Sequence, residues 1–173
     1  MNILAARQYA TPRNGPLSDP ETETRRLAYS IKSAHSPAVD FETAARDMAA
    51  LISGPCWLVP IPDSTGDTRA NTILAAHIAR HVPGAQIAKA ISRTRPTFSQ
   101  CKRHKQSLGP IAAEDHHLAR TGKALGLRQT YFVDNVTTSG NTLAAARTAL
   151  GFGAGLVFAD ARHHAPQVQA SLF

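Results

Sequence analysis

The stretch that decides the fold is YFVDNVTTSGNT, residues 131–142. An apolar run of strand type leads into Asp134, a turn rich in hydroxyl side chains follows, and helical spacing begins at Asn141. Such a turn gathers backbone N–H and hydroxyl groups at a helix N-terminus, where anions bind, and Gly140 lets the backbone approach a phosphate closely. The alternative is an ordinary helix cap of Thr, Ser and Asn. Because the Asp134 carboxylate suits sugar hydroxyl groups or a metal ion beside that phosphate, the pattern predicts a site for a ribose 5-phosphate.

Strands and helices alternate around this stretch. We expect strands at residues 56–61, 86–91, 130–136 and 155–160, and helices at residues 69–81, 113–121 and 141–150. A loop over residues 9–20 leads to two further expected helices, from residue 18 to about 32 and from about 40 to 52. Continuous apolar strands separated by helices are typical of a parallel sheet covered on both faces. Ligands bind such sheets at the carboxyl ends of the strands, so we expect the site in the loops after residues 61, 91, 136 and 160.

Two other segments add to the candidate site. The sequence VPIPDS, residues 59–64, follows the first of these apolar strands. A Pro-x-Pro turn by itself is usually only a rigid bend. Residues 92–109 contain no acid and five basic residues, which are Arg93, Arg95, Lys102, Arg103 and Lys105. A mobile loop of this charge can close over a departing anion and exclude water, whereas the alternative is a solvated run of charge.

Residues 131–142 resemble the signature with which type I phosphoribosyltransferases bind 5-phosphoribosyl 1-pyrophosphate (PRPP). The matching positions are Asp134, Val136, Thr138, Gly140 and Thr142, and Asn135 replaces a second acid. Residues 60–64 look like the pyrophosphate loop of the glutamine amidophosphoribosyltransferases and of the ComF-like phosphoribosyltransferases. In the latter an Arg-Gly-x-Asn sequence follows, partly echoed here by residues 69–71. The basic segment takes the place of the family's flexible catalytic loop, and the resemblance covers about residues 55–160.

The resemblance implies a single α/β domain over residues 1–173 with the type I phosphoribosyltransferase fold. This fold has a central, mostly parallel sheet flanked by helices, here with a core at residues 55–160 and a small variable hood at residues 1–50. The implied reaction is displacement of pyrophosphate from C1 of PRPP by a nitrogenous base or amine, assisted by Mg²⁺. The implied catalytic residues are Asp134, Asn135, Arg93, Arg95 and Lys102, with Asp134 also the expected Mg²⁺ ligand. The implied 5-phosphate residues are Thr137, Thr138, Ser139, Gly140, Asn141 and Thr142. The implied pyrophosphate residues are Pro62, Asp63, Ser64 and Arg69.

Asn135 is the departure that matters most, because an amide can form hydrogen bonds but supplies no negative charge. The N-terminal nucleophilic Cys and glutaminase domain of the amidotransferases are missing, as is the zinc-binding Cys cluster of many ComF-like proteins. An alternative function is therefore a PRPP- or nucleotide-sensing module that catalyses nothing and binds nucleic acid through residues 92–109. The net charge of +7 favours anionic partners of either kind.

Length and composition exclude several other classes of protein. A chain of 173 residues with 43% hydrophobic residues is the size of one globular domain. Its two cysteines cannot form a disulfide framework or a four-cysteine zinc site. Ser53, Gly54, Pro55 and Pro60 interrupt the longest apolar stretch, and the N-terminus lacks the apolar region of a signal peptide. We expect a cytoplasmic protein with no membrane contact, compatible with a homodimer.

Overall fold

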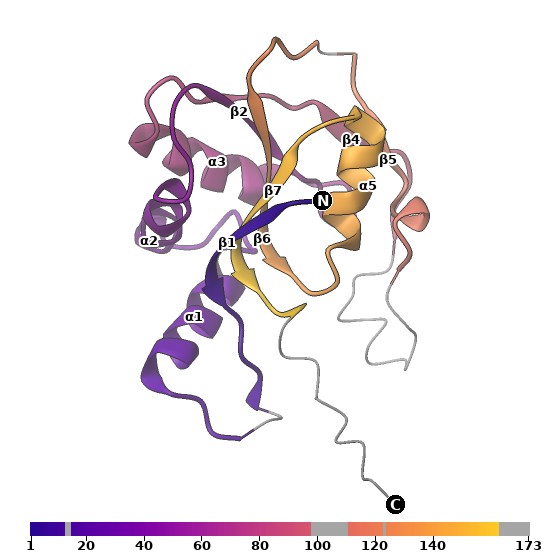
Figure 1. Cartoon of the computed structure of the whole chain (residues 1–173). Helices are drawn as coiled ribbons and strands as arrows, with labels where there is room; N and C mark the ends of the chain where they lie inside the picture. The colour runs from indigo at the N-terminus through magenta and orange to yellow at the C-terminus, as the bar shows by residue number, and fades with distance from the viewer. Residues whose placement is uncertain (13–14, 98–110, 123, 163–173) are drawn as a thin grey trace, which may run out of the picture.

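The computed structural model describes residues 1–12, 15–97, 111–122 and 124–162. The strands of this part of the chain are β1 (Ile3–Gln8), β2 (Cys56–Pro60), β3 (Gln86–Ile87), β4 (Ile91–Arg93), β5 (Leu118–Arg120), β6 (Gln129–Thr137) and β7 (Ala154–Asp160). The helices are α1 (Asp19–Ser30), α2 (Ala38–Ala49), α3 (Arg69–His81) and α5 (Asn141–Leu150), with a short 3₁₀ helix η2 (Glu114–His116) (Figure 1).

Five parallel strands form the central sheet, in the order β1-β7-β6-β2-β3. The chain leaves β2 toward β3 on one side, whereas β6 lies on the other side of β2 and leads to β7. The loops after β2 and β6 therefore run in opposite directions, which opens a crevice at the carboxyl ends of these two strands. The expectation of an α/β fold with a mostly parallel sheet flanked by helices is confirmed.

Alternate side chains of the strands enter two separate cores, because successive strand residues point to opposite faces. Leu58 and Val133 pack with buried residues of α1, α2 and α3 on one face. Val59 and Phe132 pack on the other face with buried residues of α5 and with Ile91 of β4. Figure 1 shows α2 and α3 on one side of the sheet and α5, β4 and β5 on the other. The sheet is thus covered on both faces, which the continuous apolar strands predicted.

The N-terminal segment departs from the expected hood. Residues 3–8 form β1, which pairs with β7 at the edge of the sheet, and α2 contributes Phe41 and Met48 to the larger core. The apolar part of β1 is short and half of it is alanine, so nothing in it predicted a strand. Only part of residues 1–50 lies outside the sheet and its core. The part that reaches the candidate site is the turn after α1.

Two further elements differ from expectation. The expected strand 86–91 divides: β3 belongs to the central sheet, whereas β4 pairs antiparallel with β5 in a separate two-stranded sheet. Residues 113–121 are not a helix, because His117 has a left-handed φ of 50° and residues 118–120 continue as β5. Pairing with β4, which lies far away in the sequence, determines the structure of this segment.

Candidate functional site

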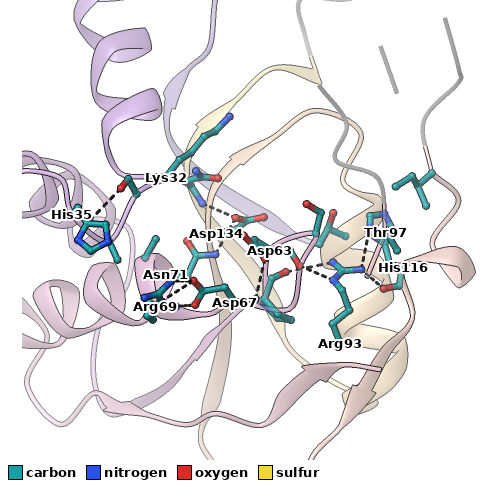
Figure 2. A pocket seen from close by; sticks show the side chains of 18 residues that line it. Lys32, His35, Asp63, Asp67, Arg69, Asn71, Arg93, Thr97, His116 and Asp134 are labelled. Atoms are coloured by element: carbon teal, nitrogen blue, oxygen red, sulfur yellow. Dashed lines mark hydrogen bonds and ion pairs between the residues drawn. The ribbon is translucent and has the colours of Figure 1, made fainter. Parts of the chain in front are cut away.

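A pocket of about 480 Å³ lies at the carboxyl ends of β2 and β6 (Figure 2). Its lining comes from the turn after α1, the loop after β2, the start of α3, the described residues between β4 and η2, the end of β6 and the start of α5. A second pocket of about 120 Å³ lies against the loop after β6, and both pockets are lined by Lys32, Asp134 and Thr142. The two pockets therefore meet beside Asp134.

The loop after β6 has the geometry that its sequence predicted. Gly140 has a φ of 79° and precedes the first residue of α5, so the backbone turns from strand to helix in a conformation that favours glycine. The smaller pocket is lined by Thr137, Thr138, Ser139, Gly140 and Thr142. Asn141 behaves differently, because its side-chain amide donates to the Ile111 carbonyl at 2.7 Å. Five of the six expected 5-phosphate residues thus share one small pocket at a helix N-terminus.

Asp134 is partly buried between the two pockets. Its Oδ1 atom accepts hydrogen bonds from the Asn135 backbone N–H at 2.8 Å and from the Asn71 side-chain amide at 3.2 Å. Burial raises the pKa of Asp134 to about 6, although these two hydrogen bonds and the positive charges of Lys32 and Arg93 oppose the shift. Near pH 7 the carboxylate is mostly ionised, and it lines both pockets.

Asn135 presents a donor to the pocket. Its Oδ1 atom lies 2.7 Å from the Val136 backbone nitrogen. A backbone N–H can only donate, so this atom must be the amide oxygen, and the NH₂ group remains for a ligand. Asp134 and Asn135 therefore form an acceptor–donor pair at the larger pocket, in place of the two acids of the resembled signature.

The loop after β2 is a tight turn organised by Asp63. The Asp63 Oδ1 atom accepts the backbone N–H groups of Thr65 at 2.8 Å and Asp67 at 3.0 Å. Arg69, at the start of α3, pairs with Asp67 at 2.7 Å on the exposed surface. All four expected pyrophosphate residues, Pro62, Asp63, Ser64 and Arg69, line the larger pocket.

The basic residues of the expected catalytic loop have different surroundings. The half-buried Arg93 donates to the carbonyls of Asp63 at 2.6 Å and Pro62 at 3.4 Å, and to that of His116. Its guanidinium group thus connects the loop after β2 to the segment before β5. Arg95 is exposed in the described part of the chain, and Lys102 lies outside the described residues together with most of segment 92–109.

Among the residues of the larger pocket that were missed as site residues are Asn71, His116 and Lys32. The Asn71 side-chain amide donates to both the Asp134 carboxylate and the Ile61 carbonyl. Its only signal in the sequence was the partial match of residues 69–71 to the Arg-Gly-x-Asn sequence of the ComF-like proteins. His116 is 3% exposed, and neither ring nitrogen has a hydrogen-bond partner among the described residues. Burial and the nearby Arg93 charge lower the pKa of His116 to about 4, so the ring is neutral near pH 7. Lys32 belongs to no motif, since it follows an N-terminal helix that the resemblance did not cover.

Comparisons with known proteins give this chain no relatives. No family model, no curated protein and no solved structure matches it. Within the described ranges, no helix is long and apolar enough to cross a membrane.

Proposed function

We propose that this protein is a phosphoribosyltransferase with a type I phosphoribosyltransferase fold, transferring the 5-phosphoribosyl group of PRPP to a nitrogenous base or amine. One observation carries the proposal. The two loops whose sequences resemble the PRPP signature and the pyrophosphate loop follow adjacent strands, β6 and β2, and line pockets that meet at Asp134. PRPP has two anionic groups on opposite sides of one ribose, and this arrangement offers a site for each.

The proposed roles follow from these positions. The 5-phosphate binds in the smaller pocket, at the N-terminus of α5, where backbone N–H groups and the helix dipole stabilise negative charge. The ribose lies over Asp134 and Asn135. The pyrophosphate faces the turn of Pro62, Asp63 and Ser64, with Arg69 beside it. Pyrophosphate leaves as the acceptor nitrogen approaches C1, and the Asp134 carboxylate stabilises the positive charge that develops on the ribosyl group.

The carboxylates of the pocket fit the Mg²⁺ ion that the resemblance implies. In phosphate sites Mg²⁺ usually keeps several waters and takes one or two carboxylates together with substrate phosphates. Asp134 and Asp63 line the pocket, and within the described residues no three His, Cys, Asp or Glu side chains are grouped to hold a metal ion. Asp134 would hold an ion whose other ligands are pyrophosphate oxygens and water, and the ion would neutralise the charge of the leaving pyrophosphate.

Pyrophosphate release across a panel of nucleobases and amines, with PRPP and Mg²⁺, tests the proposal. We expect release with at least one acceptor, and an added stability of about 2.7 kcal/mol with PRPP at a hundred times its dissociation constant. Thr142→Val removes a hydroxyl group that lines both pockets and should weaken PRPP binding. Thr72→Val is the control, because the buried Thr72 hydroxyl has no hydrogen-bond partner among the described residues and lies outside both pockets. If PRPP, ribose 5-phosphate and nucleoside monophosphates all leave the melting temperature unchanged, the proposal is wrong.

The second candidate is a PRPP- or nucleotide-sensing module that also binds nucleic acid. The amide of Asn135 in place of an acid and the net charge of +7 favour it. This candidate predicts PRPP binding without pyrophosphate release for any acceptor. It also predicts that Arg95→Ala weakens nucleic-acid binding and lowers its salt slope by about one. The transferase predicts instead that Arg95→Ala lowers turnover more than it weakens binding of a nucleoside monophosphate, which has no pyrophosphate.

A further inference from the structure

The smaller pocket receives no positive charge from the loop after β6, whose residues 137–142 have no charged side chain. Its loop residues, Thr137 to Gly140 and Thr142, offer hydroxyl and backbone N–H groups, which are neutral. A phosphate monoester carries a charge of about −1.5 to −2 near neutral pH, whereas a helix N-terminus supplies only about half a positive charge. The loop therefore satisfies the hydrogen bonds of a phosphate without balancing its charge.

Lys32 is in a position to supply the missing charge. Among the described residues that line the smaller pocket, Lys32 alone is cationic, and it also lines the larger pocket. Asp134 and Thr142 also line both pockets, so Lys32 lies at the boundary between them. Figure 2 shows Lys32 beside Asp134, with its side chain extending away from His35.

The surroundings of Lys32 fix its backbone and leave its side chain accessible. The preceding residue, Ile31, is completely buried and donates its backbone N–H to the Leu27 carbonyl at 3.0 Å. The Lys32 ammonium group lies 5.1 Å from the centre of the exposed Tyr29 ring. Such an exposed cation–π contact is weak, so the ammonium group can exchange it for a phosphate at little cost.

We propose that Lys32 binds the 5-phosphate of the sugar phosphate, so that the turn after α1 completes the site from outside the β6 loop. This inference rests on the proposed function, and it assigns a specific ligand group to a residue of the N-terminal segment. Arg69 lines only the larger pocket, beside the loop after β2 where the proposed function places the pyrophosphate. Lys32 and Arg69 therefore act on different phosphates of PRPP.

Calorimetric binding of two separate ligands, ribose 5-phosphate and pyrophosphate with Mg²⁺, tests this assignment on the full chain. We expect Lys32→Gln to weaken ribose 5-phosphate binding roughly tenfold or more, and pyrophosphate binding less than twofold. Arg69→Gln should show the opposite preference. Lys32→Arg should restore most of the affinity for ribose 5-phosphate. Lys89→Gln, which removes an exposed charge outside both pockets, should change neither.

The outcomes separate this inference from the proposed function. If the wild-type protein binds both ligands and Lys32→Gln weakens neither, or weakens both equally, the role of Lys32 is wrong and the proposed function stands. If the wild-type protein binds neither ligand, both are wrong. The melting temperatures of the unliganded variants should stay close to that of the wild type, because Lys32 is exposed.

Discussion

Asn135 lines the larger pocket, and because its amide oxygen already accepts the Val136 N–H, its NH₂ group is the part left for a ligand. In Asn135→Asp, one carboxylate oxygen keeps this hydrogen bond and the other brings a negative charge close to the proposed position of the ribose. We expect turnover to rise on the order of tenfold to a hundredfold, because a second carboxylate stabilises the ribosyl cation. The measurement is turnover and PRPP affinity for both forms, with the acceptor found in the panel.

Gln129→Glu is the control for Asn135→Asp, because it also converts an amide to a carboxylate, at the exposed amino end of β6, whereas the pocket lies at the carboxyl end of this strand. This control should leave turnover unchanged. If Asn135→Asp weakens PRPP binding without raising turnover, sugar activation does not limit the reaction, and the sensing module becomes the better interpretation.

Asp134 makes protein stability depend on pH in the direction opposite to that of an ion-paired acid. Burial raises its pKa from the ordinary 3.8 to about 6, so the folded chain binds this proton more tightly than the unfolded chain. Its contribution to the free energy of unfolding therefore falls as pH rises from about 4 to about 6. Asp134→Asn keeps a side-chain oxygen for the Asn135 N–H and removes the charge. We expect this variant to be more stable than wild type by about 1–3 kcal/mol near neutral pH, and the difference to vanish near pH 4.

Urea denaturation without metal or ligand at both pH values measures this difference. The ion-paired acids Glu23, Asp40, Glu42 and Asp67 have lowered pKa values. These acids make stability fall as pH is lowered, but they do so equally in the wild type and in Asp134→Asn. Their effect therefore cancels in the difference between the two free energies of unfolding. The exposed Glu114 provides a control substitution to Gln. A stability difference that does not change with pH would show that burial of the Asp134 charge is not costly.

At the scale of elements, the Arg93 guanidinium group holds β4, the loop after β2 and the segment before β5 together. It donates to the carbonyls of Pro62, Asp63 and His116. We expect Arg93→Ala to lower the free energy of unfolding by about 2–3 kcal/mol, because these carbonyls lose a charged donor in a half-buried place. Arg95→Ala, two residues further along on the exposed surface, should stay within about 0.5 kcal/mol of wild type. Chemical denaturation compares the two, and equal effects would contradict this role for Arg93.

Elements determined by local patterns were predictable from the sequence, and those determined by distant pairing were not. Helix α1 followed from its capping signal, since the Glu21 carboxylate accepts the Ser18 N–H at 2.9 Å. The loops after β2 and β6 followed from motifs at the ends of apolar strands. β1 and β5 were missed, because each is short and is stabilised by a strand distant in the sequence, β7 and β4 respectively. Lys32 and His116 were missed for the same reason, since they reach the site through tertiary packing alone.

At the scale of the whole molecule, the first strand of the chain packs against the loop after β6. A Cβ atom at Gly140 would lie 3.3 Å from Ile3 Cδ1, and one at Gly155 would lie 3.1 Å from Ile3 Cγ1. Ile3 therefore packs against the turn into α5 and against β7. A side chain at Gly140 would meet Ile3 and would also be strained by the φ of 79°. For this reason a substitution at Gly140 tests folding more than it tests phosphate binding.

Ile3→Ala tests the connection between the N-terminal strand and the site. Ile3 and Leu4 are adjacent in β1 and similarly half-buried, but Ile3 packs with the core under α5 whereas Leu4 packs with the core on the other face. We expect each alanine variant to lose about 1–3 kcal/mol of stability. Only Ile3→Ala should also weaken ribose 5-phosphate binding, by roughly three- to tenfold, because the turn at Gly140 loses the side chain that supports it. Denaturation and calorimetry on both variants measure the two effects. If both variants weaken ribose 5-phosphate binding equally, the loss of affinity comes from general loosening of the sheet. The inference that Ile3 specifically supports the loop after β6 is then wrong.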